Sequence, residues 1–188
     1  MNIELKNFKP SASLSEETTA YTATIWVDGK RACTAKNSGH GAPDDYRPIE
    51  GRNYNDLATL MKQIADHHLP ELLADTPIKG TEDNEWMKDC SNETIFSFVI
   101  GKLITKKLMT KTLKQRFRKN VLILEEDGSI SLLGFKGKPK IEPIHIAVVE
   151  DQHPDAIIMN TMPLDKAVDI YMTAIDKHDR ESREGESS

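Results

Sequence analysis

The chain has 188 residues, which is long enough for one ordinary domain with a real hydrophobic core. Hydrophobic residues make up 38% and charged residues 29%, which excludes a collagen-like chain, a disulfide-stapled miniprotein and a wholly disordered polypeptide. The net charge of −5 favours solubility and says little about partners. Two cysteines without a CxxC pair, and an N-terminus without a signal-peptide pattern, predict a cytoplasmic protein with reduced thiols.

The N-terminal quarter of the chain has the pattern of β structure. Residues 2–9 alternate apolar and polar side chains, which is typical of a half-buried strand. Two further strands are expected on either side of Asp28-Gly29, because a type I′ turn needs positive φ at both of its central residues. Residues 37–53 are rich in Gly, Pro, Asn and Asp, and we expect them to form a surface loop.

Helices are predicted for the middle of the chain. An apolar stripe begins at Leu57 and recurs at helical spacing as far as Ile64, and Pro70 should separate this helix from a short one at residues 70–74. Residues 85–119 also read as helical, in two pieces with a break between residues 89 and 92.

The C-terminal third mixes both kinds of element. Residues 121–135 predict a second hairpin around Asp127-Gly128, and the apolar run at residues 143–149 predicts another strand. Residues 163–177 carry the stripe of an amphipathic helix, with Pro163 in its first turn.

This order of elements predicts an α+β fold. Antiparallel β-hairpins at both ends of the chain would pack with a central group of helices and a C-terminal helix. We expect a single α+β domain over residues 1–178. The charged, weakly hydrophobic residues 179–188 are expected to form a disordered tail.

The first fifty residues also carry a specific motif. The hairpin with the Asp-Gly turn leads straight into the loop Asn37-Ser38-Gly39-His40-Gly41-Ala42. This arrangement resembles a family of uncharacterised phage, prophage and bacterial proteins, in which such a hairpin is followed by an Asn-x-Gly-His-Gly-Gly loop. Here Ala42 replaces the last glycine, while the strand at residues 3–9 and the later basic segment also fit. The resemblance implies a small cytosolic protein of phage or prophage origin and no particular chemistry.

The loop around His40 is the first candidate site. Flanking glycines let the backbone adopt positive φ and approach a ligand closely. A histidine followed by two carboxylates can act in general acid–base catalysis, although its spacing matches no metal motif and we predict neither metal nor cofactor. The alternative is a purely structural loop, whose glycines make turns. The catalytic candidates are His40, Asp44 and Asp45, and the binding candidates are Gly39, His40, Gly41 and Tyr46.

The second candidate is the basic segment 102–119. Residues 94–124 contain eight basic side chains and no acidic one, so the rest of the chain has a net charge of −13. On a helix, Lys107, Lys111, Lys114 and Arg118 would form a cationic stripe about 16 Å long. Such a stripe suits nucleic-acid phosphates or an acidic protein surface. The alternative is a solvated helix face balanced by acidic loops elsewhere.

Two hypotheses of different classes follow. The first is a non-enzymatic phage or prophage accessory protein that binds a host protein or nucleic acid through the basic segment, without a membrane. The second is a small enzyme or nucleotide-binding protein with its site in the Gly39–Tyr46 loop. The chain has no GxSxG, P-loop or GxGxxG signature, which favours the first hypothesis over the second.

Overall fold

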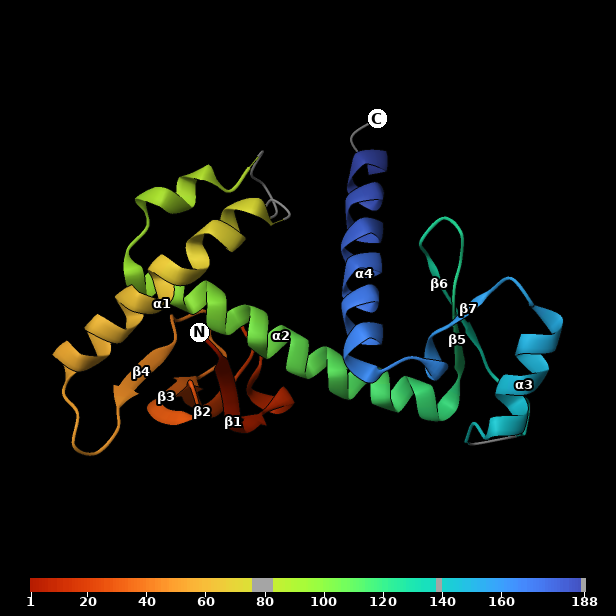
Figure 1. Ribbon diagram of the computed structural model, residues 1–188, viewed down its shortest axis with the longest axis horizontal. Helices are drawn as coiled ribbons and strands as arrows, with labels where there is room; N and C mark the ends of the chain where they lie inside the picture. The colour runs from red at the N-terminus through yellow and green to blue at the C-terminus, as the bar shows by residue number, and fades with distance from the viewer. Residues whose placement is uncertain (76–82, 138–139, 187–188) are drawn as a thin grey trace. The chain divides into compact units, whose positions relative to one another are not determined.

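The computed structural model describes residues 1–75, 83–137 and 140–186 (Figure 1). Helices and two antiparallel sheets make up the described chain, so the predicted α+β class is confirmed. The chain divides into two compact units, Met1–Ile104 and Thr105–Ser188. The sequence predicted one domain over residues 1–178. The division falls inside a helix and leaves each unit with its own antiparallel sheet.

Unit 1 begins with a four-stranded antiparallel sheet in the order β1-β2-β3-β4. The strands are β1 (Ile3–Pro10), β2 (Tyr21–Val27), β3 (Lys30–Asn37) and β4 (Asp45–Pro48). A 3-10 turn, η1 (Ala12–Leu14), lies between β1 and β2. The predicted hairpin is confirmed, because Asp28 and Gly29 have φ values of 47° and 76° as a type I′ turn requires.

Strand β4 lies inside the segment that was predicted to be a loop without regular structure. Its register pairs Ala35 with Tyr46 and Lys36 with Asp45. Tyr46 is buried, whereas its neighbours Asp45 and Arg47 are exposed. The strand has only four residues, too few for the alternation to stand out against the surrounding Gly and Pro.

Helix α1 (Tyr54–Ala74) begins with a capping box. The Asn53 Oδ1 accepts hydrogen bonds from the amides of Asn55 and Asp56, at 2.8 and 3.0 Å, and the Asp56 carboxylate accepts from the Asn53 amide. The predicted separation into two helices at Pro70 is wrong, because the proline lies inside one continuous helix. Leu72 is buried beyond Pro70, and this burial offsets the backbone hydrogen bond that proline cannot donate.

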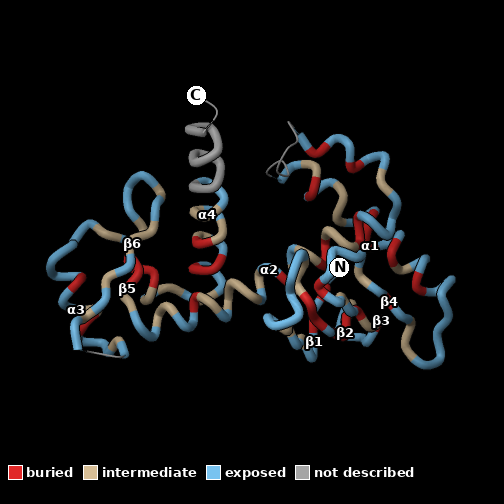
Figure 2. Tube along the Cα trace, turned by 180° about the vertical axis from the view of Figure 1, so that it is seen from behind, coloured by how far each residue is buried: buried red, intermediate tan, exposed pale blue. Residues whose placement is uncertain are grey.

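The core of unit 1 lies between the sheet and its helices. Ile25 from the sheet, Ile64 from α1, and Phe96 and Ile100 from α2 (Asn92–Lys119) are all fully buried. Buried positions recur along β1, β2 and β3 and on one side of α1 (Figure 2). Each such side chain contributes about 1.5–3 kcal/mol through the hydrophobic effect. The predicted break before α2 is confirmed, since the short η2 (Glu85–Asp89) precedes it.

Unit 2 contains a three-stranded antiparallel sheet in the order β6-β5-β7. The strands are β5 (Val121–Leu124), β6 (Ile130–Leu133) and β7 (Ile157–Ile158), followed by a short turn η3 (Met159–Thr161). The second predicted hairpin is confirmed, although its turn differs. Strand pairing ends at Leu124 and Ile130, and only Gly128 has positive φ, so the connection is longer than a type I′ turn.

Helix α3 (Pro143–Gln152) occupies the segment that was predicted to be a strand, so that prediction is wrong. His145 and Val149 are its buried residues, and their spacing of four places both on one helical face. A short apolar run does not distinguish a strand from a buried helix by its pattern alone. Pro143 in the first turn is the signal that favours the helix.

The predicted C-terminal helix is present as α4 (Leu164–Glu186), which begins at Leu164, so Pro163 lies just before the helix and not in its first turn. Its backbone continues to Glu186, into the segment that was expected to be a disordered tail. Two clusters form the core of unit 2. Leu113, Leu122 and Val168 belong to one, which joins α2, β5 and α4, whereas Ile123 and Val149 belong to the other, which joins β5 and α3.

Candidate functional site

The glycine loop, residues 37–44, connects β3 to β4 and is organised by the side chain of Asn37. Its Oδ1 accepts hydrogen bonds from the Gly39 amide at 2.7 Å and from the Thr18 hydroxyl at 2.9 Å. Its Nδ2 donates to the Ala42 carbonyl at 3.0 Å and to the Asp44 carboxylate at 2.9 Å. One amide therefore holds both ends of the loop and ties it to the segment before β2.

Gly39 is required by a close approach of two backbone segments. Its carbonyl accepts hydrogen bonds from the amides of three successive residues, 16–18, at 3.0–3.3 Å. Its φ is 91°, and a Cβ at this position would overlap the Leu14 carbonyl. A Cβ at Gly41 would likewise overlap the Glu17 carboxylate. Both glycines therefore allow close contacts with other segments of the protein, which favours the alternative interpretation that this loop is purely structural.

The three catalytic candidates of the loop have separate partners. His40 Nδ1 lies 3.1 Å from Glu16 Oε2, and both side chains are more than half exposed. The Asp45 carboxylate accepts from the Arg47 guanidinium at 2.8 and 2.9 Å, while Asp44 turns toward Asn37 and Tyr46. Among the described residues, no three His, Cys, Asp or Glu side chains are grouped closely enough to hold a metal ion.

Tyr46, a predicted binding residue, faces the interior. Its hydroxyl donates to Asp44 Oδ2 at 2.9 Å and lies 3.2 Å from Ser97 Oγ of α2, while its ring packs edge-on against Phe96. Burial raises the pKa of Tyr46, and the Asp44 charge raises it further. Tyr46 is therefore a neutral residue that joins the loop to the core.

Two neighbouring groups are equally unreactive. Burial, followed by the nearby Asp44 carboxylate, raises the pKa of Tyr21, so its hydroxyl stays protonated. Burial also raises the pKa of the Cys33 thiol to about 12, so it is protonated at neutral pH and is not activated as a nucleophile.

The basic segment contains an open row of cations, here called the α2 stripe: Lys107, Lys111, Lys114 and Arg118. All four side chains are exposed, and together with Thr110 and Gln115 they line a shallow hollow of about 420 Å³. No ion pair joins any of them to an acidic side chain in the part of the chain that the structure describes. The helical spacing predicted for this row is confirmed.

Other cations of the same segment are engaged within the protein. Lys102 forms ion pairs with Asp75 at 2.8 Å and Glu71 at 3.2 Å, and Lys106 pairs with Asp169 at 2.6 Å. The Arg116 guanidinium lies 5.2 Å from the centre of the Tyr171 ring. Three cations of the basic segment are therefore engaged within the protein, whereas the α2 stripe and Lys119 are exposed and form no ion pair with any described residue.

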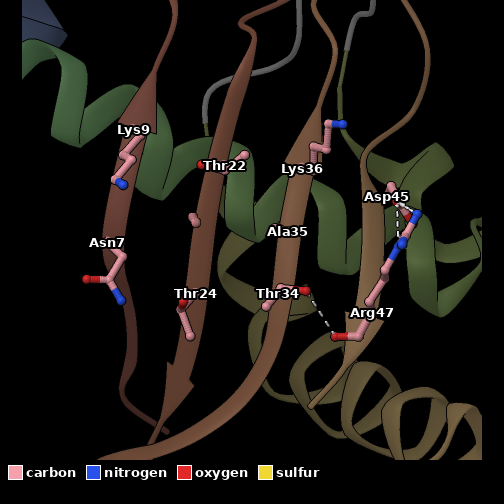
Figure 3. Close-up of a pocket in the computed structure, with 10 residues that line it drawn as sticks. Asn7, Lys9, Thr22, Thr24, Thr34, Ala35, Lys36, Asp45 and Arg47 are labelled. Carbon is pink, nitrogen blue, oxygen red and sulfur yellow. Dashed lines mark hydrogen bonds and ion pairs between the residues drawn. The ribbon is translucent and has the colours of Figure 1, made fainter. Parts of the chain in front are cut away.

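The structure also shows a cationic surface that sequence reasoning missed. The face of the four-stranded sheet turned away from the helices carries a hollow of about 380 Å³ (Figure 3). Its polar lining includes Lys9, Thr22, Lys36 and Arg47, from all four strands. These side chains are far apart in sequence, so no local charge cluster marked them. The only available signal was the set of polar positions in each predicted strand.

Comparison of this chain with protein families, with curated proteins and with solved structures found no match. The similarity to a phage and prophage family therefore stays a prediction. None of the helices in the described ranges has both the length and the apolar run needed to cross a bilayer.

Proposed function

We propose that the protein binds nucleic acid through the α2 stripe. The observation that supports this proposal is the contrast within one segment: Lys102 and Lys106 have acidic partners, whereas the stripe has none among the described residues. Unpaired cations in one row repel each other and weaken the helix slightly. A polyanion that pairs with all of them removes this repulsion.

The spacing of the stripe suits a phosphate backbone. From position 107 to position 118 the helix rises about 16 Å, at 1.5 Å per residue. Lys111 and Lys114 lie between these ends, so successive charges are three or four residues apart, which is about one helical turn. Four phosphate contacts with duplex DNA would contribute about −3.6 to the slope of log K against log salt. The contacts are to the backbone, so they carry no sequence preference.

Fluorescence anisotropy with a labelled duplex, measured over a salt series, tests this proposal. The triple variant Lys107→Gln, Lys111→Gln, Lys114→Gln should bind more weakly, and its salt slope should be flatter by about 2.7. Glutamine preserves helix propensity, so the helix should persist. Lys166→Gln is the matched control, since Lys166 is exposed on α4 of the same unit and should leave binding unchanged. Equal binding by both variants would contradict the proposal.

An acidic host protein is the other partner that the α2 stripe suits. Capture from host lysate, with and without nuclease, separates the two classes of partner. Retention of a protein after nuclease treatment, lost in the triple variant, would favour the protein partner over nucleic acid. Phage or prophage origin and a role as an accessory protein remain proposals that rest on the sequence resemblance.

The alternative function, an enzyme or nucleotide-binding protein with its site in the Gly39–Tyr46 loop, gains no support from the contacts described. Asn37 and Asp44 are engaged in holding the loop, and His40 lies exposed beside Glu16. A general base needs a substrate position within hydrogen-bond reach, and His40 lines neither the hollow at the α2 stripe nor the hollow on the outer face of the sheet.

A further inference from the structure

We propose that the outer face of the N-terminal sheet is a second nucleic-acid-binding surface and that it takes a single strand. This surface, here called the sheet face, consists of Lys9, Thr22, Thr24, Thr34, Lys36 and Arg47. It lies in unit 1, whereas the α2 stripe lies in unit 2, so the inference stands whether or not the stripe binds nucleic acid.

Strand register brings the cations of the sheet face together. Lys9 pairs with Thr22, and Thr22 pairs with Lys36, so two ammonium groups flank one hydroxyl in a single row. Neighbouring strands are about 4.8 Å apart, which places the two lysine backbones about 10 Å apart. In the next row Thr24 pairs with Thr34, and Thr34 pairs with Arg47.

The charge of this surface is mainly positive. Its hollow of about 380 Å³ has Lys9, Lys36 and Arg47 in its lining, and Asp45 as the one acidic residue. Asp45 is held by Arg47 in an ion pair of 2.8 Å, visible at the edge of Figure 3. Lys9 and Lys36 have no acidic partner among the described residues, so they present their charge to solvent. A ligand that complements this face must be anionic.

The groups between the cations favour a single strand over a duplex. Three threonine hydroxyls and the Asn7 amide line the hollow, and Asn7 projects there because a bulge in β1 gives it a φ of 53°. Hydroxyl and amide groups hydrogen-bond to base edges, which an unpaired strand exposes and a duplex directs into its grooves.

Trp26 extends the same face toward the Asp28-Gly29 turn. It pairs with Glu4 and Arg31 in the next row of the register, so it shares the side of the sheet that carries Thr22 and Thr24. The Lys6 ammonium lies 4.0 Å from its ring centre. An aromatic ring beside a cationic groove is the usual arrangement for stacking a base of single-stranded nucleic acid.

Tryptophan fluorescence provides a direct readout. The chain has two tryptophans, so Trp86→Phe leaves Trp26 as the only one, at the sheet face. Trp86 packs against Phe98, so phenylalanine keeps an aromatic contact there. The full chain with this substitution is titrated with an oligothymidylate of about 20 nucleotides. We expect saturable quenching that weakens as salt rises.

Adding Lys9→Gln and Lys36→Gln should weaken this binding several-fold and flatten its salt slope by about 1.4, or 0.7 per lost contact. Lys30→Gln is the matched control, because Lys30 pairs with Val27 at the turn, outside the hollow, and should change neither quantity. Thermal melting of each variant checks that the sheet is intact.

Three outcomes would overturn the inference. Affinity and salt slope of the double variant could equal those of the Lys30→Gln control. Duplex DNA could quench Trp26 as strongly as the single strand. Polyglutamate could quench Trp26 while oligothymidylate does not, which would identify an acidic protein as the ligand.

If only the triple variant of the α2 stripe weakens binding, the inference fails and the proposed function stands. If only the sheet variants weaken binding, the inference stands and the proposed function fails.

Discussion

The glycine loop and the α2 stripe are the two segments that stood out in the sequence, and they differ in what their polar groups contact. Asn37, Asp44 and the backbone of Gly39 are hydrogen-bonded to other parts of unit 1. The α2 stripe forms no ion pair with any described acidic side chain. An unusual motif can therefore reflect folding, whereas charges without internal partners indicate a surface that is open to a ligand.

The largest effect that this comparison predicts concerns Gly39. Gly39→Ala should destabilise the protein by about 3 kcal/mol, because its φ is strained for alanine and its Cβ would overlap the Leu14 carbonyl. Gly51→Ala is the control, since Gly51 also has positive φ but has nothing within 4 Å of its Cβ position, and it should cost only about 1 kcal/mol. Urea denaturation measures both. Equal losses of stability in the two variants would mean that the close approach of the Leu14 carbonyl adds nothing to the cost of Gly39→Ala.

A second prediction separates Asn37 from His40. Asn37→Ala should cost about 2 kcal/mol, because it removes the side chain that bonds Thr18, Gly39, Ala42 and Asp44. His40→Ala should change the free energy of unfolding by less than about 0.5 kcal/mol, since its pairing with Glu16 is exposed. If His40→Ala destabilised the protein more than Asn37→Ala, the structural account of the loop would be wrong.

A third prediction uses pH. Burial raises the pKa of Cys33 from its ordinary value of 9.0 to about 12, so the folded state keeps this proton after the unfolded chain has lost it. The thiol's contribution to stability is complete below about pH 9 and should decline by about 1.4 kcal/mol per pH unit between pH 9 and pH 12. Cys33→Ala should show a correspondingly shallower loss over this range. If the free energy of unfolding fell equally steeply with pH in the unmodified protein and in Cys33→Ala, the burial of an unactivated thiol would be contradicted.

The smallest effect is expected at the paired cations of α2. Lys102→Ala should cost up to about 1 kcal/mol at low salt and less at high salt, because its ion pairs with Glu71 and Asp75 are partly exposed. Lys107→Ala should leave stability nearly unchanged, since Lys107 has no acidic partner among the described residues. Chemical denaturation at two salt concentrations makes this comparison. Equal losses of stability in Lys102→Ala and Lys107→Ala would contradict the distinction between cations that are paired within the protein and cations of the α2 stripe.

The sequence was most informative where a local rule determines the structure. Asp28-Gly29 identified its hairpin, and the spacing from Lys107 to Arg118 placed four cations on one helical face. Tertiary contacts decided the rest. The four-residue β4 forms because β3 offers it a partner, and residues 143–149 are helical because His145 and Val149 are buried on one side. The sheet face depends on register between distant strands, which no local pattern reports.

The most direct test of the account is the salt dependence of nucleic-acid binding by the full chain and by Lys107→Gln, Lys111→Gln, Lys114→Gln. We predict that the triple variant binds a labelled duplex more weakly and that its slope of log K against log salt is flatter by about 2.7, with Lys166→Gln unchanged. The same affinity and the same slope for all three proteins would contradict the claim that the α2 stripe is a binding surface.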